Sequence, residues 1–316
     1  MNLYQWDIQL LSGSLTPWHS DTIFGHICWA IAEQEGPEYL QDIINRCLIG
    51  EPPFVFSDGF PSGFMPMPCG DLMAKSTEPL CKADALVAIK QAKRLKSIRY
   101  LQLGAFQDLI LGNPVSFGEL EKPEISSYSI VHNTIDRNQG ITLKGGLFSE
   151  VESWTEAITI YILIEDGWET KIENLLERIE NKGYGAKVSR GKGNFKTIKF
   201  GLSKGFASSL NPNGFIVLSH CLPTKDMPPA AQYQISIKYG KIGANAESEN
   251  PFKRPIIMLE PGAVFWTTKN LKPWYGRMAQ GIHPGYPNVV QNGMAIAVPC
   301  NIKPPKTLEE QYAECF

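Results

Sequence analysis

A glycine-rich run from Gly183 to Phe195 contains the residue types and spacing best suited to chemistry. Four glycines within eleven residues allow the backbone to turn tightly and to approach a ligand closely. Cations, a hydroxyl and backbone N–H groups in such a run form a concave site for phosphate. The candidate phosphate ligands are Lys187, Ser189, Arg190 and Lys192, in a loop shaped by Gly183, Gly185, Gly191 and Gly193. We predict phosphate contact in preference to a helix C-cap followed by a solvated turn, which explains Gly183 alone.

The run differs from the P-loop of nucleotide-binding enzymes. Gly185 and Gly191 are one position too far apart, and Gly193 stands where a P-loop has its magnesium-binding Ser or Thr. The predicted helix also precedes the run instead of following it. A nucleotide-binding enzyme is therefore the most remote of the functions considered.

A second polar segment, His132 to Arg137, follows a predicted strand. Asn133 and Arg137 have the side chains to hydrogen-bond an RNA phosphate or a base edge. An ion pair between Asp136 and Arg137 that braces a loop explains the same residues equally well. The sequence leaves both interpretations open.

His19 lies where a helix is predicted to begin, and it is a candidate general acid or base because histidine titrates close to neutral pH. Ser20 and Asp21 are explained as a helix cap and a first-turn acid. A structural histidine beside a cap is the more common case. The histidines without a partner at metal-site or triad spacing are His26, His220 and His283.

Known catalytic patterns are missing from the sequence. It contains no GxSxG or HExxH motif and no paired-carboxylate motif, so hydrolase chemistry lacks support. The 7 cysteines are scattered and form no CxxC pair, which argues against a disulfide framework and against a zinc site. We predict no catalytic residue, no metal and no cofactor.

The distribution of charge along the chain is uneven. The formal net charge of the 316 residues is −2, which taken alone argues against a nucleic-acid partner. Residues 1–180, however, carry 13 basic and 25 acidic side chains, whereas residues 181–316 carry 17 and 7. The basic part suits a polyanion, and Lys253 and Arg254 in a proline-bracketed turn add two candidate RNA contacts. For the acidic part we expect protein docking, apart from a basic stretch over 82–99.

No targeting or membrane segment is recognised. The N-terminus lacks the positive region of a signal peptide. The longest apolar stretch, Ala157 to Ile164, is far shorter than the ~20 residues that span a bilayer. We expect a cytoplasmic protein with no membrane contact.

Hydrophobic periodicity predicts an α+β fold. The expected order is strand, helix, insertion, strand, strand, helix, strand, which is the split βαβ, ferredoxin-like pattern. Residues 1–210 would form this domain with an insertion at about 37–125, and residues 211–316 a β-rich domain that could be a degraded copy. The strands expected in the first domain cover 2–11, 126–135, 155–164 and 195–200, and its helices 20–36, 82–111 and 172–179.

Several short motifs together resemble the RAMP proteins of CRISPR systems. They occur in order along most of the chain and resemble most closely the family of the fourth subunit of the Csm, or type III-A, effector complex. The motifs are Ser20–Gly25, Phe54–Pro61 followed by Met65–Pro68, Asn133–Arg137, Gly145–Phe148, Gly191–Phe195, Asn250–Lys253 and Pro261–Phe265. The departures from the family pattern are His132 for Arg, Gln139 for Thr, Ala186 for Gly and Arg190 for Ser.

The resemblance implies two ferredoxin-like (RRM-like) domains with an inserted thumb. It implies a non-catalytic subunit that binds the 5′ handle of crRNA, reaches the guide–target duplex, and docks the Cas10-type large subunit and a neighbouring backbone RAMP subunit. The RNA contacts expected from the residues and the resemblance together are His19, Ser20, Asn133, Arg137, Gly185, Lys187, Ser189, Arg190, Gly191, Lys192, Gly193, Lys253 and Arg254. The alternative is a metal-independent crRNA-processing endoribonuclease with His19 as acid or base.

Overall fold

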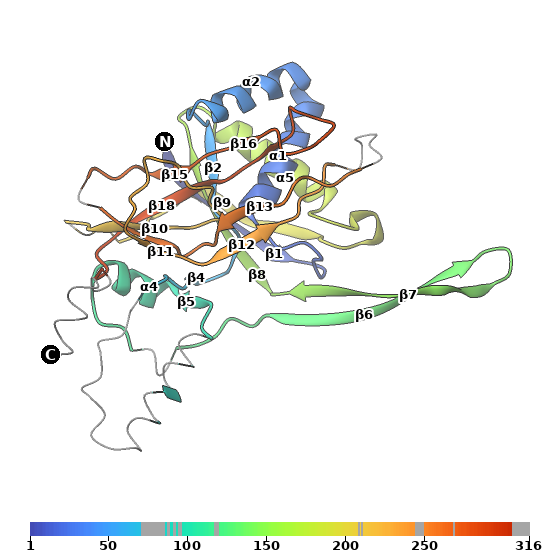
Figure 1. Cartoon of the computed structure of the whole chain (residues 1–316), viewed down its shortest axis with the longest axis horizontal. Helices are drawn as coiled ribbons and strands as arrows, with labels where there is room; N and C mark the ends of the chain where they lie inside the picture. Colours follow the sequence, from blue (N-terminus) through green and yellow to red (C-terminus); the bar gives the residue numbers. More distant parts are fainter. Residues whose placement is uncertain are drawn as a thin grey trace.

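The structure is a computed structural model of the chain. It describes residues 1–70, 86, 89–90, 93, 97–116, 120–207, 209, 211–243, 250–267 and 269–304. Figure 1 shows a body of packed strands flanked by helices, and a long hairpin that projects away from this body. The predicted α+β class is confirmed.

The first sheet forms the centre of the N-terminal half. Its order is β2-β8-β1-β9, with β3 beside β8, and all neighbouring strands are antiparallel. The β-branched run of β8 is buried on nearly every residue, so this strand lies in the interior on both faces. The strands are β1 (Asn2–Leu10), β2 (Phe54–Phe56), β3 (Phe60–Pro61), β8 (Ala157–Ile164) and β9 (Phe195–Leu202).

Two helices are associated with this sheet, and a third packs against one of them. Helix α1 (Ser20–Glu35) contributes buried Ile23, Phe24, Ile27 and Ile31 to the core, and α5 (Glu169–Lys182) buries its leucines and isoleucines. Helix α2 (Pro37–Leu48) follows α1 directly, since Gly36 ends the first helix and proline suits the first position of the next. None of the described helices has the length and apolar character needed to cross a bilayer.

The second strand of this sheet is not where the sequence predicts it. The predicted strand over 126–135 lies outside the sheet, and β2 occupies that place next to β8. The segment around β2 is rich in Pro and Gly and its sequence is typical of a loop, but the side chains of Phe54, Val55 and Phe56 are at most 1% exposed. Three buried residues are too short a run for periodicity to identify. The predicted insertion at about 37–125 therefore contains a strand of the first sheet.

Within the predicted insertion range, β4 (Phe64–Pro66) pairs with β5 (Tyr100–Gln102), and α4 (Leu103–Ile110) follows. Most of the predicted basic helix over 82–99 lies outside the described residues.

A hairpin of β6 (Ser126–Asp136) and β7 (Ile141–Trp154) projects from the body (Figure 1). Most residues of both strands are exposed or half-buried, on both faces of the ladder. This projecting hairpin, which has the shape of the expected thumb, thus begins at Ser126, directly after the predicted insertion at about 37–125.

The C-terminal half is built from strands. Its main sheet has the antiparallel order β11-β14-β10-β18-β15, and the predicted β-rich character is confirmed. The described part of 211–304 contains no helix. The strands are β10 (Gly214–Val217), β11 (Ala231–Gln232), β14 (Val264–Trp266), β15 (Trp274–Gly276) and β18 (Met294–Cys300), with two small ladders, β12 (Ile235–Lys238) with β13 (Ile256–Leu259) and β16 (Ala279–Gln280) with β17 (Val290–Gln291).

The two halves share one core. A single hydrophobic cluster includes Trp6 and Ile160 of the first sheet together with Ile216 and Ile296 of the second. The halves are also joined through the backbone, where the Asp58 N–H donates to the Leu218 carbonyl at 2.9 Å. Because burial of apolar side chains is the main stabilising term in folding, we treat the two halves as one body.

Candidate nucleic-acid interface

The glycine-rich loop after α5 closes on itself and requires glycine. The Tyr184 N–H donates to the Gly193 carbonyl at 2.9 Å, which brings the two ends of the loop together. A Cβ at Gly193 would lie 1.9 Å from the Tyr184 carbonyl oxygen, and its φ is +67°. A Cβ at Gly185, with φ +81°, would lie 2.6 Å from the Thr16 Cβ. The backbone therefore turns tightly, as predicted, but its close approach is to Tyr184 and Thr16 of the protein itself.

The loop rests on the segment that leads into α1. The Tyr184 ring stacks on Trp18 at a centroid distance of 3.8 Å, and its hydroxyl donates to the Pro17 carbonyl at 2.7 Å. The Ala186 N–H donates to Thr16 Oγ1 at 3.0 Å. The Gly185 N–H donates to His26 Nε2 at 3.0 Å, and burial lowers the pKa of His26, which favours the neutral, accepting ring. The loop is held in place before any ligand arrives.

Most backbone N–H groups of the loop already donate hydrogen bonds within the protein, so few of them are left to bind the predicted phosphate. The amides of residues 184–186 and 190–194 all donate within the protein. Those left over belong to Lys187, Val188 and Ser189. Lys187 is left-handed (φ 62°, ψ 29°), alone among the described non-glycine residues, and the helical turn Val188–Arg190 follows it. A left-handed residue followed by a right-handed turn is the backbone pattern that can direct successive amides at one anion.

The cations of the loop face acidic side chains of the hairpin, a pairing that we did not predict from the sequence. Arg190 Nη1 and Lys187 Nζ lie 3.4 and 3.9 Å from Glu150 Oε1, and Lys192 pairs with Glu152. The glutamate side chains are only 13% and 7% exposed. Glu150 and Glu152 stand two positions apart on β7, so they share one face of the strand. This spacing of two acidic residues is the feature of the sequence that could have indicated an acidic face opposite the loop cations.

His132 joins this cluster from β6. Its Nε2 lies 3.2 Å from Glu150 Oε2, and its Nδ1 lies 3.3 Å from Arg190 Nη2. The ring also stacks on Phe148 at 5.3 Å. His132 stands where the resembling family often has Arg, and here it links the hairpin to the loop.

Ion pairs between the acidic and basic parts of the chain extend beyond the loop. Lys182 pairs with Glu33, and Lys238 pairs with Asp21. Together with the ion pairs of the three loop cations, these contacts neutralise part of the negative charge of residues 1–180 with positive charge from residues 181–316. The uneven charge of the sequence is thus partly used in holding the protein together.

The predicted polar segment His132–Arg137 contacts the loop only through His132 among the described residues. Asn133 is next to His132, and its Nδ2 donates to Thr142 Oγ1 at 3.2 Å. Arg137 is exposed in the turn at the hairpin tip, away from the loop. Asp136 Oδ1 accepts the N–H groups of Asn138 and Gln139 at 2.8 and 3.4 Å, so it shapes this turn. Among the described residues no ion pair joins Asp136 to Arg137.

Lys253 and Arg254 are not part of this cluster. Lys253 Nζ donates to the Val290 carbonyl at 2.9 Å and to Gln291 Oε1 at 3.1 Å. Burial lowers the pKa of Lys253, consistent with a cation committed to the interior. Arg254 is exposed, and its backbone N–H donates to the Ile282 carbonyl.

A cavity of about 1510 Å³ opens beside the loop's support and is lined by residues of both halves. His19, Asp58 and His220 stand together on its wall, and the rings of the two histidines are 4.2 Å apart. Asp58 Oδ2 bonds His220 Nδ1 at 2.7 Å, and Asp58 Oδ1 accepts the Ser20 N–H at 2.8 Å. Asp58 thus caps α1, a role predicted for Ser20. Ser20 itself is 0% exposed, so its side chain is not on the surface where the predicted contact with RNA would form.

The buried carboxylate and the histidine shift each other's pKa values. Burial alone would raise the pKa of Asp58, but the charge and hydrogen bond of His220 hold it well below its usual range. Burial alone would lower the pKa of His220, and Asp58 raises it. For His19, burial prevails and lowers the pKa to about 4. The sequence offers His220 no partner at short spacing, because its partner is 162 positions away.

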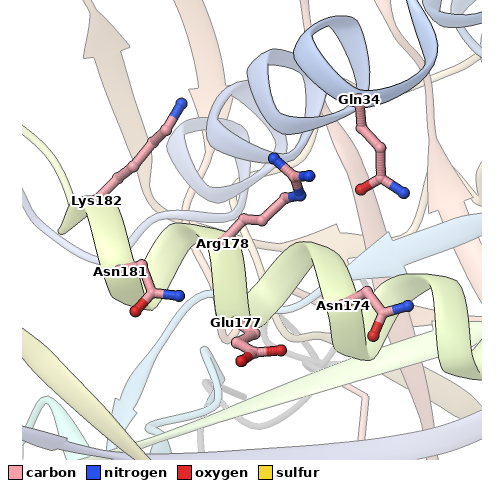
Figure 2. A pocket seen from close by; sticks show the side chains of 6 residues that line it. All are labelled: Gln34, Asn174, Glu177, Arg178, Asn181 and Lys182. Atoms are coloured by element: carbon pink, nitrogen blue, oxygen red, sulfur yellow. The ribbon is translucent and has the colours of Figure 1, made fainter.

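A smaller hollow of about 510 Å³ lies where α1 and α5 run side by side. Figure 2 shows polar side chains around it, and it contains no aromatic ring. We assign no ligand to it. The lining residues are Gln34, Asn174, Glu177, Arg178, Asn181 and Lys182.

No protein-family model matches the sequence, and no curated protein matches it. Among solved structures, a chain in the Csm1–Csm4 cassette bound to pppApA has a TM-score of 0.63 and 16% identity, covering 96% of this chain and 99% of that one. The cassette bound to cA4 gives 0.62 and 17%, covering 96% and 100%. The Csm3–Csm4 subcomplex of the type III-A CRISPR-Cas interference complex gives 0.61 and 15%, covering 95% and 100%. The chain therefore has the fold of a type III-A complex subunit over nearly its whole length.

Proposed function

We propose that the chain is a non-catalytic RNA-binding subunit of a type III-A CRISPR-Cas complex that holds the 5′ handle of crRNA and docks the Cas10-type large subunit. The observation that carries this proposal is the turn at Lys187–Ser189, with its left-over amides and adjacent cations. The fold supports it, since Csm4 is the subunit common to all three similar structures.

The strand order supports a pair of ferredoxin-like units. The first sheet has the order β2-β8-β1-β9. If its four strands are numbered along the chain, their order in the sheet is therefore second, third, first, fourth. Strands β10, β11, β14 and β18 of the other sheet lie in the same order, again antiparallel. The second unit has loops and small ladders where the first has helices, and this explains why the sequence shows no repeat.

The loop would bind one phosphate at Lys187–Ser189 and the next through exposed side chains. Lys187 and Arg190 have side chains that are 48% and 41% exposed, so they reach solvent as well as Glu150. Phosphate contacts position an RNA strand without reading its sequence. An RNA backbone that enters this site must compete with the Glu150 carboxylate for both cations.

The hairpin supplies a surface for partners. It exposes apolar side chains on an element that projects from the body (Figure 1), and exposed apolar surface of this kind marks contact with another macromolecule. We propose that it contacts the neighbouring backbone subunit and the guide–target duplex. The exposed side chains are Tyr128, Val131, Ile135, Ile141, Leu143, Leu147, Phe148 and Val151.

The alternative, a metal-independent endoribonuclease, has one observation in its favour: His19 and His220 lie together in a cavity. Two features weigh against it. A pKa of about 4 keeps His19 neutral near pH 7, which makes it a poor general acid and a weak general base. The 4.2 Å between the rings leaves no room for a phosphate between them. Cleavage of repeat RNA by the purified chain, abolished in His19→Ala, would establish the alternative.

The double variant Lys187→Ala/Arg190→Ala tests the proposal. We expect weaker binding of a single-stranded handle RNA, and a salt dependence whose log–log slope falls by about 0.7 for each phosphate that the chain no longer neutralises. Fluorescence anisotropy at several salt concentrations measures both quantities. Lys182→Ala is the matched control, because this exposed lysine pairs with Glu33 outside the loop. Unchanged affinity and slope in the double variant would remove the loop from the RNA site.

A further inference from the structure

Three side chains that could ligate a metal converge on the wall of the cavity. One donor atom from each of His19, Asp58 and His220 lies within 4.8 Å of the other two. His220 and Asp58 are 6% and 3% exposed, whereas His19 is half-buried. Two of these side chains come from the N-terminal half of the chain and one from the C-terminal half. The proposed RNA site does not include this cluster.

Hydrogen bonding orients one imidazole for coordination. Asp58 is fixed by the Ser20 N–H and bonds His220 Nδ1, so the proton of His220 is on Nδ1 when the ring is neutral. Its Nε2 then has a free lone pair. A carboxylate that holds one ring nitrogen while the other binds the ion is the usual second layer of a histidine metal site.

The second imidazole is available as well. Within the described part of the chain the His19 ring contacts His220 but has no hydrogen-bond partner. Two buried polar atoms of neighbouring residues, Trp18 Nε1 and Ser20 Oγ, also lack a partner there. Buried polar groups are normally satisfied, so these atoms have hydrogen-bonding capacity left over on either side of His19 in the sequence. A bound ion with its water molecules provides suitable partners.

We propose that His19 and His220 bind one divalent transition-metal ion of the zinc or cobalt type, with Asp58 holding the His220 ring by its other nitrogen. Imidazole nitrogens suit these ions, and the remaining coordination positions are open to water or a ligand. The donor atoms lie within 4.8 Å of one another, and two nitrogens must come to about 3.4 Å apart to bind one tetrahedral ion at about 2.1 Å.

The surrounding charge suits a dication. Asp58 contributes one negative charge, and the nearby Asp21 and Lys238 neutralise each other. The bound ion would join the two halves of the chain and place a positive charge on the cavity wall, where an anionic ligand can reach its open position.

Cobalt binding to the RNA-free full chain, after removal of metal with a chelator, tests the proposal directly. We expect one equivalent of Co²⁺ with the visible ligand-field absorption of a nitrogen- and oxygen-ligated site, and displacement of that absorption by Zn²⁺. His220→Gln should weaken binding by at least about tenfold, and Asp58→Asn by about tenfold to a hundredfold. His283→Gln is the control, since this buried histidine bonds the Asn250 carbonyl outside the cluster.

His19→Gln keeps the test decisive if the variants at Asp58 or His220 fail to fold, because the His19 ring has no hydrogen bond to another residue in the part of the chain that the structure describes. Loss of the cobalt absorption in His19→Gln, with an unchanged circular dichroism spectrum, supports the site. An absorption that persists in this variant, or none in the wild-type chain, overturns the proposal. The assay contains no RNA, so its outcome is independent of the handle-binding proposal.

Discussion

Replacement of Glu150 and Glu152 by glutamine should make the chain bind RNA more tightly. The two carboxylates pair with Lys187, Arg190 and Lys192, the cations proposed to grip phosphate. Glutamine keeps the shape and an accepting oxygen but removes the charge. An RNA phosphate then no longer has to displace a carboxylate from these cations.

The size of the effect follows from the exposure of the pairs. Lys187 and Arg190 are 48% and 41% exposed, so each ion pair with Glu150 contributes at most about 1 kcal/mol. Breaking both ion pairs costs RNA at most about 2 kcal/mol, equivalent to a change in Kd of up to about thirtyfold. We expect a gain of this size, together with a salt slope steeper by about 0.7 for each cation released.

Fluorescence anisotropy with a labelled single-stranded handle RNA, repeated over a range of salt concentrations, measures the affinity and the slope. Glu173→Gln is the matched control, because it removes one exposed negative charge from α5, away from the loop. Weaker binding by the Glu150→Gln/Glu152→Gln variant would refute the competition, since the carboxylates would then be holding the cations in their RNA-binding positions.

Three further predictions concern the loop and the core. Gly193→Ala should cost about 3 kcal/mol in the free energy of unfolding, measured by urea denaturation, whereas Gly191→Ala should cost about 1 kcal/mol because its Cβ meets nothing within 4 Å. Lys253→Met should leave RNA affinity unchanged in the anisotropy assay, because this cation is bonded inside the protein; a large decrease would return it to the RNA site. Phe54→Ala should cost about 3–5 kcal/mol and Tyr128→Ala less than about 0.5 kcal/mol, and similar values for both would contradict the placement of β2 in the core.

The parts of the fold with a long repeating pattern were predictable. The run of apolar residues in β8, the alternation in β1 and the stripe on α5 each identify their element, because one face or the whole strand is buried. β2 was missed because three residues carry no periodicity, and the long hairpin was placed in the sheet because its sequence also favours strand.

The candidate site was predictable only where its residues are neighbours in the sequence. The glycines and cations of the loop stand within eleven positions and were found together. Asp58 and His220 are 162 positions apart, and only the folded chain joins them. The loop cations could be identified as charged, but not as paired, because Glu150 and Glu152 reach them through the hairpin register.

The most direct test of the central claim is to locate where the RNA contacts the chain. A handle RNA with photoreactive uridines, crosslinked to the full chain and mapped by mass spectrometry of the peptides, gives this position. We predict adducts within residues 183–195. Crosslinks confined to other parts of the chain, or an RNA that does not crosslink at all, would contradict the proposed handle site.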